Sequence, residues 1–422
     1  MSKEKNVSRL RFPGFTDDWE QHKFGDLADY KKGPFGSAIT KDMFVPKGDG
    51  AVKVYEQQNA INKDWSLERY FLPKEYALTK LKSFEVHGGD IIVSCAGTIG
   101  EIYEIPEVAE SGVINQALMR VRVNESIIDK KMFIISFSNM IDDFTRAHSN
   151  GSAIKNIPPF ADLKPMEVLI PSINEQRKIS GFFEGIDNLI TLHQRKCEAM
   201  KRYKSGMLQK VFPREGQRVP EVRFPGFTGA WEKCKLGEVC ERVTRKNKNG
   251  ESDLPLTIAS QYGLIDQRDF FNRVVAAKDM SNYYLLKKGE FAYNKSYSNG
   301  FDYGSIKRLN AYEQGCLSTL YICFGITSDD VESDYLECYF DTLKWYEDVS
   351  QICAEGARNH GLLNVDTKAF FDEVTIEMPS SKEEQSKISA YLNNLDNLIT
   401  LHQRKCEELK EYKKGLLQQM FV

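Results

Sequence analysis

The sequence of 422 residues has no apolar run that approaches the roughly 20 residues of a membrane-spanning helix. Its start, from Met1 to Asn6, also lacks the apolar stretch of a secretory signal peptide. We therefore expect a cytoplasmic protein without membrane contact. Hydrophobic residues make up 41% of the chain and charged residues 28%, which excludes collagen-like and largely disordered proteins.

Motifs for metals and for catalysis are missing as well. The nine cysteines are odd in number and include no C-x-x-C pair, so we expect reduced thiols and no metal site. No H-E-x-x-H or G-x-S-x-G motif occurs, and Gly97-Thr98-Ile99-Gly100 lacks the spacing of a phosphate-binding loop. Asn156-Ile157-Pro158-Pro159-Phe160 resembles the Asn-Pro-Pro-aromatic motif of amino-methyltransferases, but the inserted isoleucine would displace the asparagine. The sequence therefore favours binding over catalysis, and we expect no catalytic residues.

A strong excess of one charge is also absent. The 57 basic and 60 acidic residues give a formal net charge of -3. Such a balance provides no global attraction to a polyanion. Any nucleic-acid role therefore requires local basic patches.

The chain contains a tandem repeat. Arg11-Phe12-Pro13-Gly14-Phe15-Thr16 recurs at 223–228, and the twelve residues from Asp187 to Glu198 recur unchanged at 396–407. Over the longer windows 172–212 and 381–421, 25 of 41 positions are identical. The stretches between these matches differ much more, so each half consists of a variable domain followed by a nearly constant segment.

The constant segment is predicted to be a long helix. Ser172-x-x-Glu175 and Ser381-x-x-Glu384 are capping-box patterns, in which serine and glutamate bond free amides at a helix start. The following residues repeat an apolar position every seven residues over five heptads, which is typical of a coiled coil. About 40 residues at a rise of 1.5 Å give a helix of roughly 60 Å.

A helix with such a stripe needs a partner, and the obvious one is its own copy. The expected seam comprises Ile179, Ile186, Leu189, His193, Met200, Ile388, Leu395, Leu398, His402 and Leu409. Antiparallel packing about a pseudo-twofold axis would bring the two histidines together. Such a pair is either a register-setting or pH-sensitive contact or an ordinary half-exposed histidine pair, and the sequence leaves both interpretations open.

These features predict an α+β protein with two mixed α/β domains separated by two long helices that pair as a coiled coil. Because a whole domain connects the helices, the length of the connection allows either orientation. The first domain covers residues 1–171 and the first helix 172–212. A linker and the second domain cover 213–380, and the second helix covers 381–422. The join lies near Pro213-Arg214-Glu215-Gly216-Gln217, where a proline and a polar stretch follow the periodic run.

Basic and polar segments recur at equivalent places in the two variable domains. Four basic residues at 242, 245, 246 and 248 have no acid among them, and Asn294-Lys295-Ser296-Tyr297-Ser298-Asn299 combines a lysine with side chains that can reach base edges. Tyr30-Lys31-Lys32-Gly33 takes the place of the first cluster in the first domain. Each segment alone is typical of a solvated loop, and their recurrence favours a polyanionic partner.

The whole chain resembles the DNA-specificity subunit of Type I restriction–modification systems. The resemblance rests on Glu-Gln-(Arg/Ser)-Lys-Ile-Ser at 175–180 and 384–389, on the repeated Asp-Asn-Leu-Ile-Thr-Leu-His-Gln-Arg-Lys helix and on the Arg-Phe-Pro-Gly-Phe openings. Gly97-Thr98-Ile99-Gly100 followed by Asn115-Gln116-Ala117 adds to it. The alternation of two variable domains with two matched helices is specific to this family.

The resemblance implies a non-catalytic subunit that binds double-stranded DNA, with one domain for each half of an asymmetric bipartite site. The helices would form an antiparallel coiled coil that sets the spacing and docks two methyltransferase subunits, which use S-adenosylmethionine to methylate adenine. Restriction subunits with motor and nuclease activity would use ATP and Mg, while this chain holds no cofactor. A specificity subunit of a bipartite Type II-like methylase–nuclease, a non-DNA coiled-coil scaffold and an autonomous methyltransferase are the alternatives.

Polar and basic residues in loops or at strand ends are the usual positions for reading DNA. On this basis the candidate DNA contacts are Lys31, Lys32, Ser94, Thr98 and Gln116 in the first domain, and Arg242, Arg245, Lys246, Gln261, Asn294, Lys295, Ser296 and Arg358 in the second.

Overall fold

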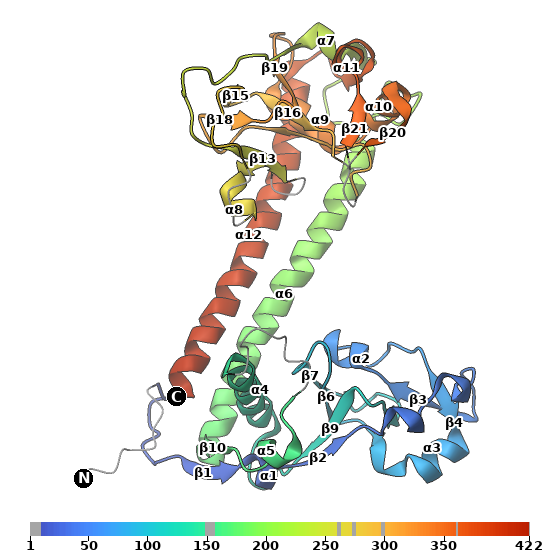
Figure 1. The fold of residues 1–422 in the computed structure, drawn as a ribbon, viewed down its shortest axis with the longest axis vertical. Coiled ribbons are helices and arrows are strands. Elements are labelled where there is room, and N and C mark those ends of the chain that lie inside the picture. The colour runs from blue at the N-terminus through green and yellow to red at the C-terminus, as the bar shows by residue number, and fades with distance from the viewer. Residues whose placement is uncertain are drawn as a thin grey trace. The chain divides into compact units, whose positions relative to one another are not determined.

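The computed structural model describes residues 10–147, 157–259, 263–271, 276–296, 300–359 and 362–421, without the side chains of 354–359 and 362. The chain divides into two compact units. The first unit comprises residues 1–192 and 405–422, and the second comprises 193–404. Because the two long helices cross this division, each unit contains one globular domain and a part of both helices (Figure 1).

The globular part of the first unit contains two four-stranded sheets and a strand pair. The central sheet is antiparallel, in the order β2 (Ala28–Lys32), β9 (Leu118–Val123), β6 (Ile91–Ser94) and β7 (Ile102–Glu104). The second sheet has the order β4 (Phe71–Pro73), β3 (Ala51–Tyr55), β8 (Gly112–Ile114) and β5 (Glu85–Val86), with β3 and β8 parallel. Strands β1 (Glu20–Lys23) and β10 (Glu167–Ile170) form the pair.

Helices connect and cover these strands. The longest of them, α4 (Lys130–Ala147), packs its buried face, which includes Phe133 and Phe137, against the central sheet and the start of α6. The shorter elements of the first unit are α1 (Phe24–Leu27), α2 (Gln57–Ile61), α3 (Lys74–Lys80), α5 (Phe160–Leu163) and the 3-10 turns Gly36–Ala38, Lys41–Met43 and Lys82–Phe84.

The second unit repeats the central sheet with different residues. Its order is β12 (Cys240–Arg242), β19 (Ile322–Ile326), β16 (Phe291–Asn294) and β17 (Ser305–Arg308), which corresponds strand for strand to β2, β9, β6 and β7. Four two-stranded pairs accompany it: β11 (Glu232–Lys235) with β22 (Thr375–Met378), β13 (Leu256–Ala259) with β14 (Gly263–Asp266), β15 (Tyr284–Lys287) with β18 (Gln314–Leu317), and β20 (Cys353–Asn359) with β21 (Leu362–Val365). The helices are α7 (Leu236–Val239), α8 (Gln267–Phe271), α9 (Ser333–Asp341), α10 (Tyr346–Ile352) and α11 (Thr367–Glu373).

The long helices α6 (Ile173–Val211) and α12 (Lys382–Met420) pack together as an antiparallel pair, which confirms the predicted fold class. In the second unit His193 contacts His402 and Lys204 bonds Asp396. The residue numbers rise along α6 and fall along α12, so the two helices run in opposite directions. In the first unit Lys413 of α12 bonds Asp187 of α6, the same lysine–aspartate contact in the other copy.

The buried row of each helix alternates steps of four and three residues. On α6 it runs through Ile179, Phe183, Ile186, Ile190, His193 and Cys197, and on α12 through Ile388, Leu392, Leu395, Ile399, His402 and Cys406. The histidines, Met200 and Leu409 of this row are half-buried. A strict heptad spacing of this kind keeps one seam facing the partner helix.

Leu189 and Leu398 do not belong to this row, although the sequence pattern placed them in the seam. Their side chains are 47% and 39% exposed. Both lie three residues after a seven-residue repeat position, whereas the residues four after it, Ile190 and Ile399, are the buried ones. Apolar residues occupy both positions in this stretch, so the pattern alone did not distinguish the two rows.

An arginine–glutamate pair ties each globular domain to the start of its own helix. In the first unit Arg11 donates from Nε and Nη2 to the two carboxylate oxygens of Glu175, at 2.9 and 2.6 Å. Arg223 makes the same pair of bonds to Glu384, at 2.7 and 2.8 Å. Because both oxygens of each carboxylate accept from arginine, the predicted bond from glutamate back to the serine amide was wrong. The serine half of the pattern is present in the second helix, where the Glu384 amide donates to Ser381 Oγ at 3.4 Å. Arginine of the repeated Arg-Phe-Pro-Gly-Phe opening takes the carboxylate instead.

The end of each long helix packs on a tryptophan of the other repeat. Phe212, just after α6, lies 5.9 Å from Trp231 in the second unit. Phe421, just after α12, lies 5.8 Å from Trp19 in the first unit. Each helix therefore starts in one unit and ends in the other.

Candidate nucleic-acid interface

The topology of the first unit gathers one set of candidate residues at one edge of the central sheet. Strand β2 ends at Lys32, β9 begins at Leu118 and β6 ends at Ser94, and these ends pair with one another. The loops that follow β6 and precede β9 lie at this edge, since the Cys95 amide donates to the Ala117 carbonyl at 2.8 Å. Residues distant in sequence are thereby brought together.

Glycine makes this close approach possible. A Cβ atom on Gly33 would lie 1.8 Å from the carbonyl oxygen of Asn115. Any other residue at this position would push the end of β2 away from the loop before β9. Thus Lys32 and Gln116, both exposed, are held beside one another by the backbone.

The remaining accessible candidates of the first unit are Lys31 and Thr98. The Lys31 ammonium lies 4.9 Å from the centre of the Phe84 ring. Thr98 is exposed, and Gln57 fixes its loop by donating to the Thr98 carbonyl at 2.8 Å. The lysine is thus partly packed on an aromatic ring, while the threonine side chain faces solvent.

Ser94 does not fit its predicted role as a DNA contact. Its side chain is fully buried, and its hydroxyl accepts a hydrogen bond from the Glu101 amide at 2.9 Å. A buried hydroxyl engaged in this way closes the β6–β7 hairpin and is not available to DNA. Gly97 and Gly100 adopt φ of 70° and 80° in the same hairpin, a conformation that favours glycine.

The second unit gathers its candidates at the corresponding sheet edge. β12 ends at Arg242 and β16 ends at Asn294, on either side of the start of β19. Arg242 Nη2 donates to the Tyr284 hydroxyl at 3.0 Å, and the Lys246 ammonium lies 3.7 Å from the centre of the same ring. Tyr284 therefore positions two cations at once.

Arg245 is engaged elsewhere, contrary to its place among the candidate contacts. Its guanidinium donates to both carboxylate oxygens of Glu290, at 2.8 and 2.7 Å, and to the Leu285 carbonyl at 3.2 Å. A bidentate ion pair of this kind neutralises the cation and holds the segment after β12 against β15. Arg245 is thus a structural residue in this arrangement.

Lys295 and Arg242 form a site of positive charge. Burial lowers the pKa of the Lys295 ammonium, and the positive charge of Arg242 lowers it further. The two positive charges repel each other, and an anion such as a phosphate would stabilise both. Beside them, Asn294 accepts a hydrogen bond from the Ser296 amide at 3.0 Å, which shapes the turn at this edge.

Two further candidates have side chains outside the described part of the structure. Gln261 lies outside the described residues. Arg358 lies in β20 opposite Leu363, but its side chain is also outside the described part. Asn156 of the methyltransferase-like motif falls outside as well.

Sequence reasoning missed the residues that hold these edges in place. Gln57 and Tyr284 lie 41 and 42 residues from Thr98 and Arg242, so no local pattern links them. The sequence showed only that Gln57 and Tyr284 lie in or next to strand-like segments, which does not indicate the residues that they contact. Contacts of this kind are set by strand pairing.

Within the described ranges, no group of three or more histidine, cysteine or acidic residues is arranged to hold a metal ion. All nine cysteines are free thiols. Across the same ranges, no helix combines the length and apolar character needed to cross a bilayer.

Comparison with known proteins identifies the family. The Type I restriction modification DNA specificity domain matches residues 16–202 and again 229–411. The Type I restriction enzyme MjaVIII specificity subunit of Methanocaldococcus jannaschii is 22% identical over 98% of this chain and 95% of its own.

Two solved structures share the fold. The S subunit of a Type I restriction–modification system from M. genitalium superposes with a TM-score of 0.57 at 15% identity, over 99% of both chains. A chain from a study of complex assembly and conformational transition of the type I R-M system gives a TM-score of 0.54 at 16% identity, over 98% of this chain and 99% of that one. With two copies of the family domain in one polypeptide, the protein belongs to the DNA specificity subunits of Type I restriction–modification systems, a non-catalytic family.

Proposed function

We propose that the chain reads an asymmetric bipartite DNA site, with one sheet edge contacting each half-site. The observation that carries this proposal is the recurrence of basic and polar side chains at the same edge of two sheets of identical strand order. The side chains themselves differ between the edges, which supports two different half-sites. Cations position the domain on phosphates, and polar side chains read bases.

The proposed contacts follow from accessibility and from the partners of each side chain. In the first unit they are Lys31, Lys32, Thr98 and Gln116, and in the second Arg242, Lys246, Asn294, Lys295 and Ser296. Ser94 and Arg245 are left out because a backbone amide and Glu290 already engage them. The lysines and Arg242 bind phosphates, while Gln116 and Asn294 contact base edges.

The long helices are proposed to dock two methyltransferase subunits and to fix the spacing of the half-sites. Equivalent leucines on the two helices support one docking site in each unit. Leu189 and Leu192 of α6 are 47% and 45% exposed, and Leu398 and Leu401 of α12 are 39% and 46% exposed. Exposed apolar residues gathered on a helix face are typical of a partner-binding surface.

The partner subunits supply the chemistry of the complex in this proposal. S-adenosylmethionine binds the methyltransferase subunits, and ATP and Mg bind the restriction subunits, which act on cytoplasmic DNA. This chain contributes the recognition of the site. A complex of this composition is consistent with the assembly named for one of the structural relatives.

Methylation mapping tests the proposal directly. The chain is co-expressed with its methyltransferase subunit in a host without adenine methylation, and modified adenines are located by single-molecule sequencing. We expect one motif with two unlike half-sites separated by a fixed gap. Exchange of residues 28–123 for those of a different specificity subunit should change one half-site and leave the other intact. Loss of both half-sites in a folded exchange variant, or a motif without a gap, would contradict the proposal.

A further inference from the structure

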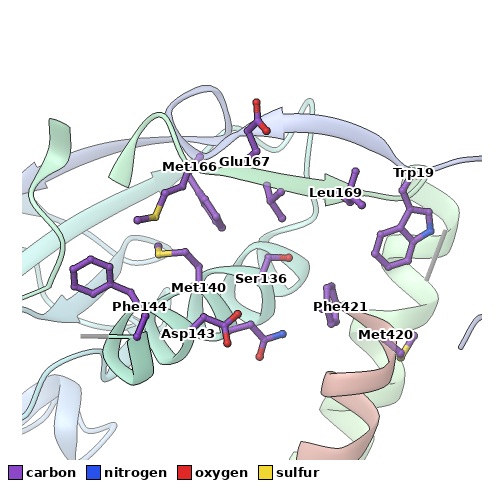
Figure 2. Close-up of a pocket in the computed structure, with 14 residues that line it drawn as sticks. Trp19, Ser136, Met140, Asp143, Phe144, Met166, Glu167, Leu169, Met420 and Phe421 are labelled. Carbon is purple, nitrogen blue, oxygen red and sulfur yellow. The ribbon is translucent and has the colours of Figure 1, made fainter. Parts of the chain in front are cut away.

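A pocket of about 580 Å³ lies in the first unit between α4, strand β10 and the end of α12. None of the residues proposed to contact DNA lines it. Figure 2 shows Ser136 and Met140 rising from α4 toward β10, with Met420 and Phe421 closing one side. Its wall is mostly apolar, with the adaptable side chains of three methionines, Met140, Met166 and Met420.

Ser136 is the unusual member of this wall. The residue is only 3% exposed, and its hydroxyl has no hydrogen-bond partner among the described residues. A buried hydroxyl without a partner costs about 1–3 kcal/mol, so such groups normally have one. Among the described residues, Trp19 Nε1 is also buried without a partner, but Trp231 Nε1 shares this property in the second unit. Of the described side chains that line the pocket, Ser136 is thus the one whose unpartnered group has no counterpart in the second unit.

In the second unit, the helix equivalent to α4 is α9, and it carries an aromatic ring at the position of Ser136. The Asp129 amide bonds Gln176 before α4, and the Glu332 amide bonds Gln385 before α9, which aligns the two helices. Asp129 and Glu332 are 203 residues apart, and so are Asn124 and Thr327 of the preceding turns, whose amides bond the carbonyls of Leu27 and Val239. At this offset Ser136 corresponds to Tyr339.

Tyr339 shows how the equivalent space is used. Its ring is buried, 6.0 Å from that of Phe212, and its hydroxyl donates to the Thr375 carbonyl at 3.1 Å. Phe421 and Glu167 hold the corresponding positions in the first unit, and both line the pocket. The first unit therefore has the residues that surround the Tyr339 ring in the second unit, but it has Ser136, without a ring, in place of the tyrosine.

We propose that this pocket binds a small para-substituted phenol with a polar group at each end of one aromatic ring. The phenolic hydroxyl donates to the Glu167 carbonyl, as Tyr339 donates to Thr375. The group at the other end bonds the Ser136 hydroxyl, and Met140, Met166 and Phe421 pack on the ring. Binding stabilises the folded first unit by mass action.

The test uses 4-hydroxybenzyl alcohol as the probe, titrated into the full chain with carbon-13 label in the methionine methyl groups. The chain has 11 methionines. We expect saturable shifts at Met140, Met166 and Met420, and none at the other eight. The probe 4-methylphenol lacks the second hydroxyl and should bind about fivefold more weakly, as expected for one hydrogen bond of about 1 kcal/mol.

Two variants complete the test. Ser136→Ala should weaken 4-hydroxybenzyl alcohol by the same factor and leave 4-methylphenol unchanged. Ser136→Tyr places the ring of the second unit in the first and should abolish binding of both probes. Shifts that do not saturate, shifts spread over all methionines, or equal binding by wild type and Ser136→Tyr would overturn the proposal. If Ser136→Tyr does not fold, the comparison of the two probes on wild type and Ser136→Ala decides the question alone.

Discussion

The two compact units keep the same anchoring contacts and differ at the edges of their central sheets. The same donor and acceptor atoms form the bonds of Arg11 with Glu175 and of Arg223 with Glu384. The rings of Phe421 and Trp19 lie at nearly the same distance as those of Phe212 and Trp231. At the sheet edge, by contrast, the first unit offers lysines beside a glutamine and the second an arginine and lysine around Tyr284. A constant frame thus carries variable side chains, as expected of a protein that changes specificity without changing its assembly.

The largest effect is expected from breaking one anchoring pair. Glu175→Ala leaves Arg11 without its buried partner and should lower the free energy of unfolding of the first unit by about 3–5 kcal/mol. Glu384→Ala should do the same to the second unit. Hydrogen exchange of the full chain would locate each loss.

The exposed pair between Lys368 and Asp372 provides the control for these variants. Because both side chains are in solvent, Asp372→Ala should change stability by less than about 1 kcal/mol. A Glu175→Ala variant that loosened both units equally would show that the anchors do not act separately.

A base-reading residue should have the next largest effect, confined to one position. Asn294→Ala is expected to cost about 1–3 kcal/mol of discrimination at one base of one half-site. Gln116→Ala should relax a position in the other half-site. Methylation mapping of each variant measures this, and relaxation of the same half-site by both variants would contradict the assignment of one domain to each half.

A phosphate-binding residue should act on all sequences alike. Lys246→Ala should weaken binding to any duplex and reduce the slope of log affinity against log salt by about 1. Arg245→Ala is the control in the same loop, since its guanidinium is already paired with Glu290. We expect no change of the salt slope in that variant, and an equal reduction in both would assign Arg245 to DNA.

The histidine pair should give the smallest effect. His193 Nδ1 lies 2.9 Å from His402 Nδ1, so one nitrogen donates and the other accepts. Burial first, and then the charges of His193 and Lys196, lower the pKa of His402. A lowered pKa in the folded state means that stability is present above the unfolded pKa of about 6.5 and is lost as the pH falls through the folded value.

Thermal unfolding between pH 8 and 5 measures this loss. The wild type should lose more stability on acidification than His402→Gln, which cannot take up the proton. Equal pH dependence of the two proteins would leave the pair as an ordinary half-exposed contact.

The sequence predicted the duplication and the two long helices because both rest on repeated or periodic patterns, whereas the antiparallel orientation followed from the family resemblance. It misplaced Leu189 and Leu398 because apolar residues stand both three and four residues after the repeat position. It assigned Glu175 to the helix cap because Arg11 is 164 residues away in the chain. Ser94 and Arg245 were misjudged for the same reason, since strand pairing decides what is buried and what is paired.

The central claim is that two unlike domains read one duplex at a spacing set by the helices. Deletion of one heptad from each helix, residues 194–200 together with 403–409, keeps the heptad spacing of the buried row and the exposed leucines proposed to dock the methyltransferase subunits. It shortens the pair by about 10 Å at 1.5 Å per residue. Methylation mapping of this variant should show both half-sites unchanged and the gap shortened by about three base pairs at 3.4 Å each. An unchanged gap with active methylation, or altered half-site sequences, would contradict the account.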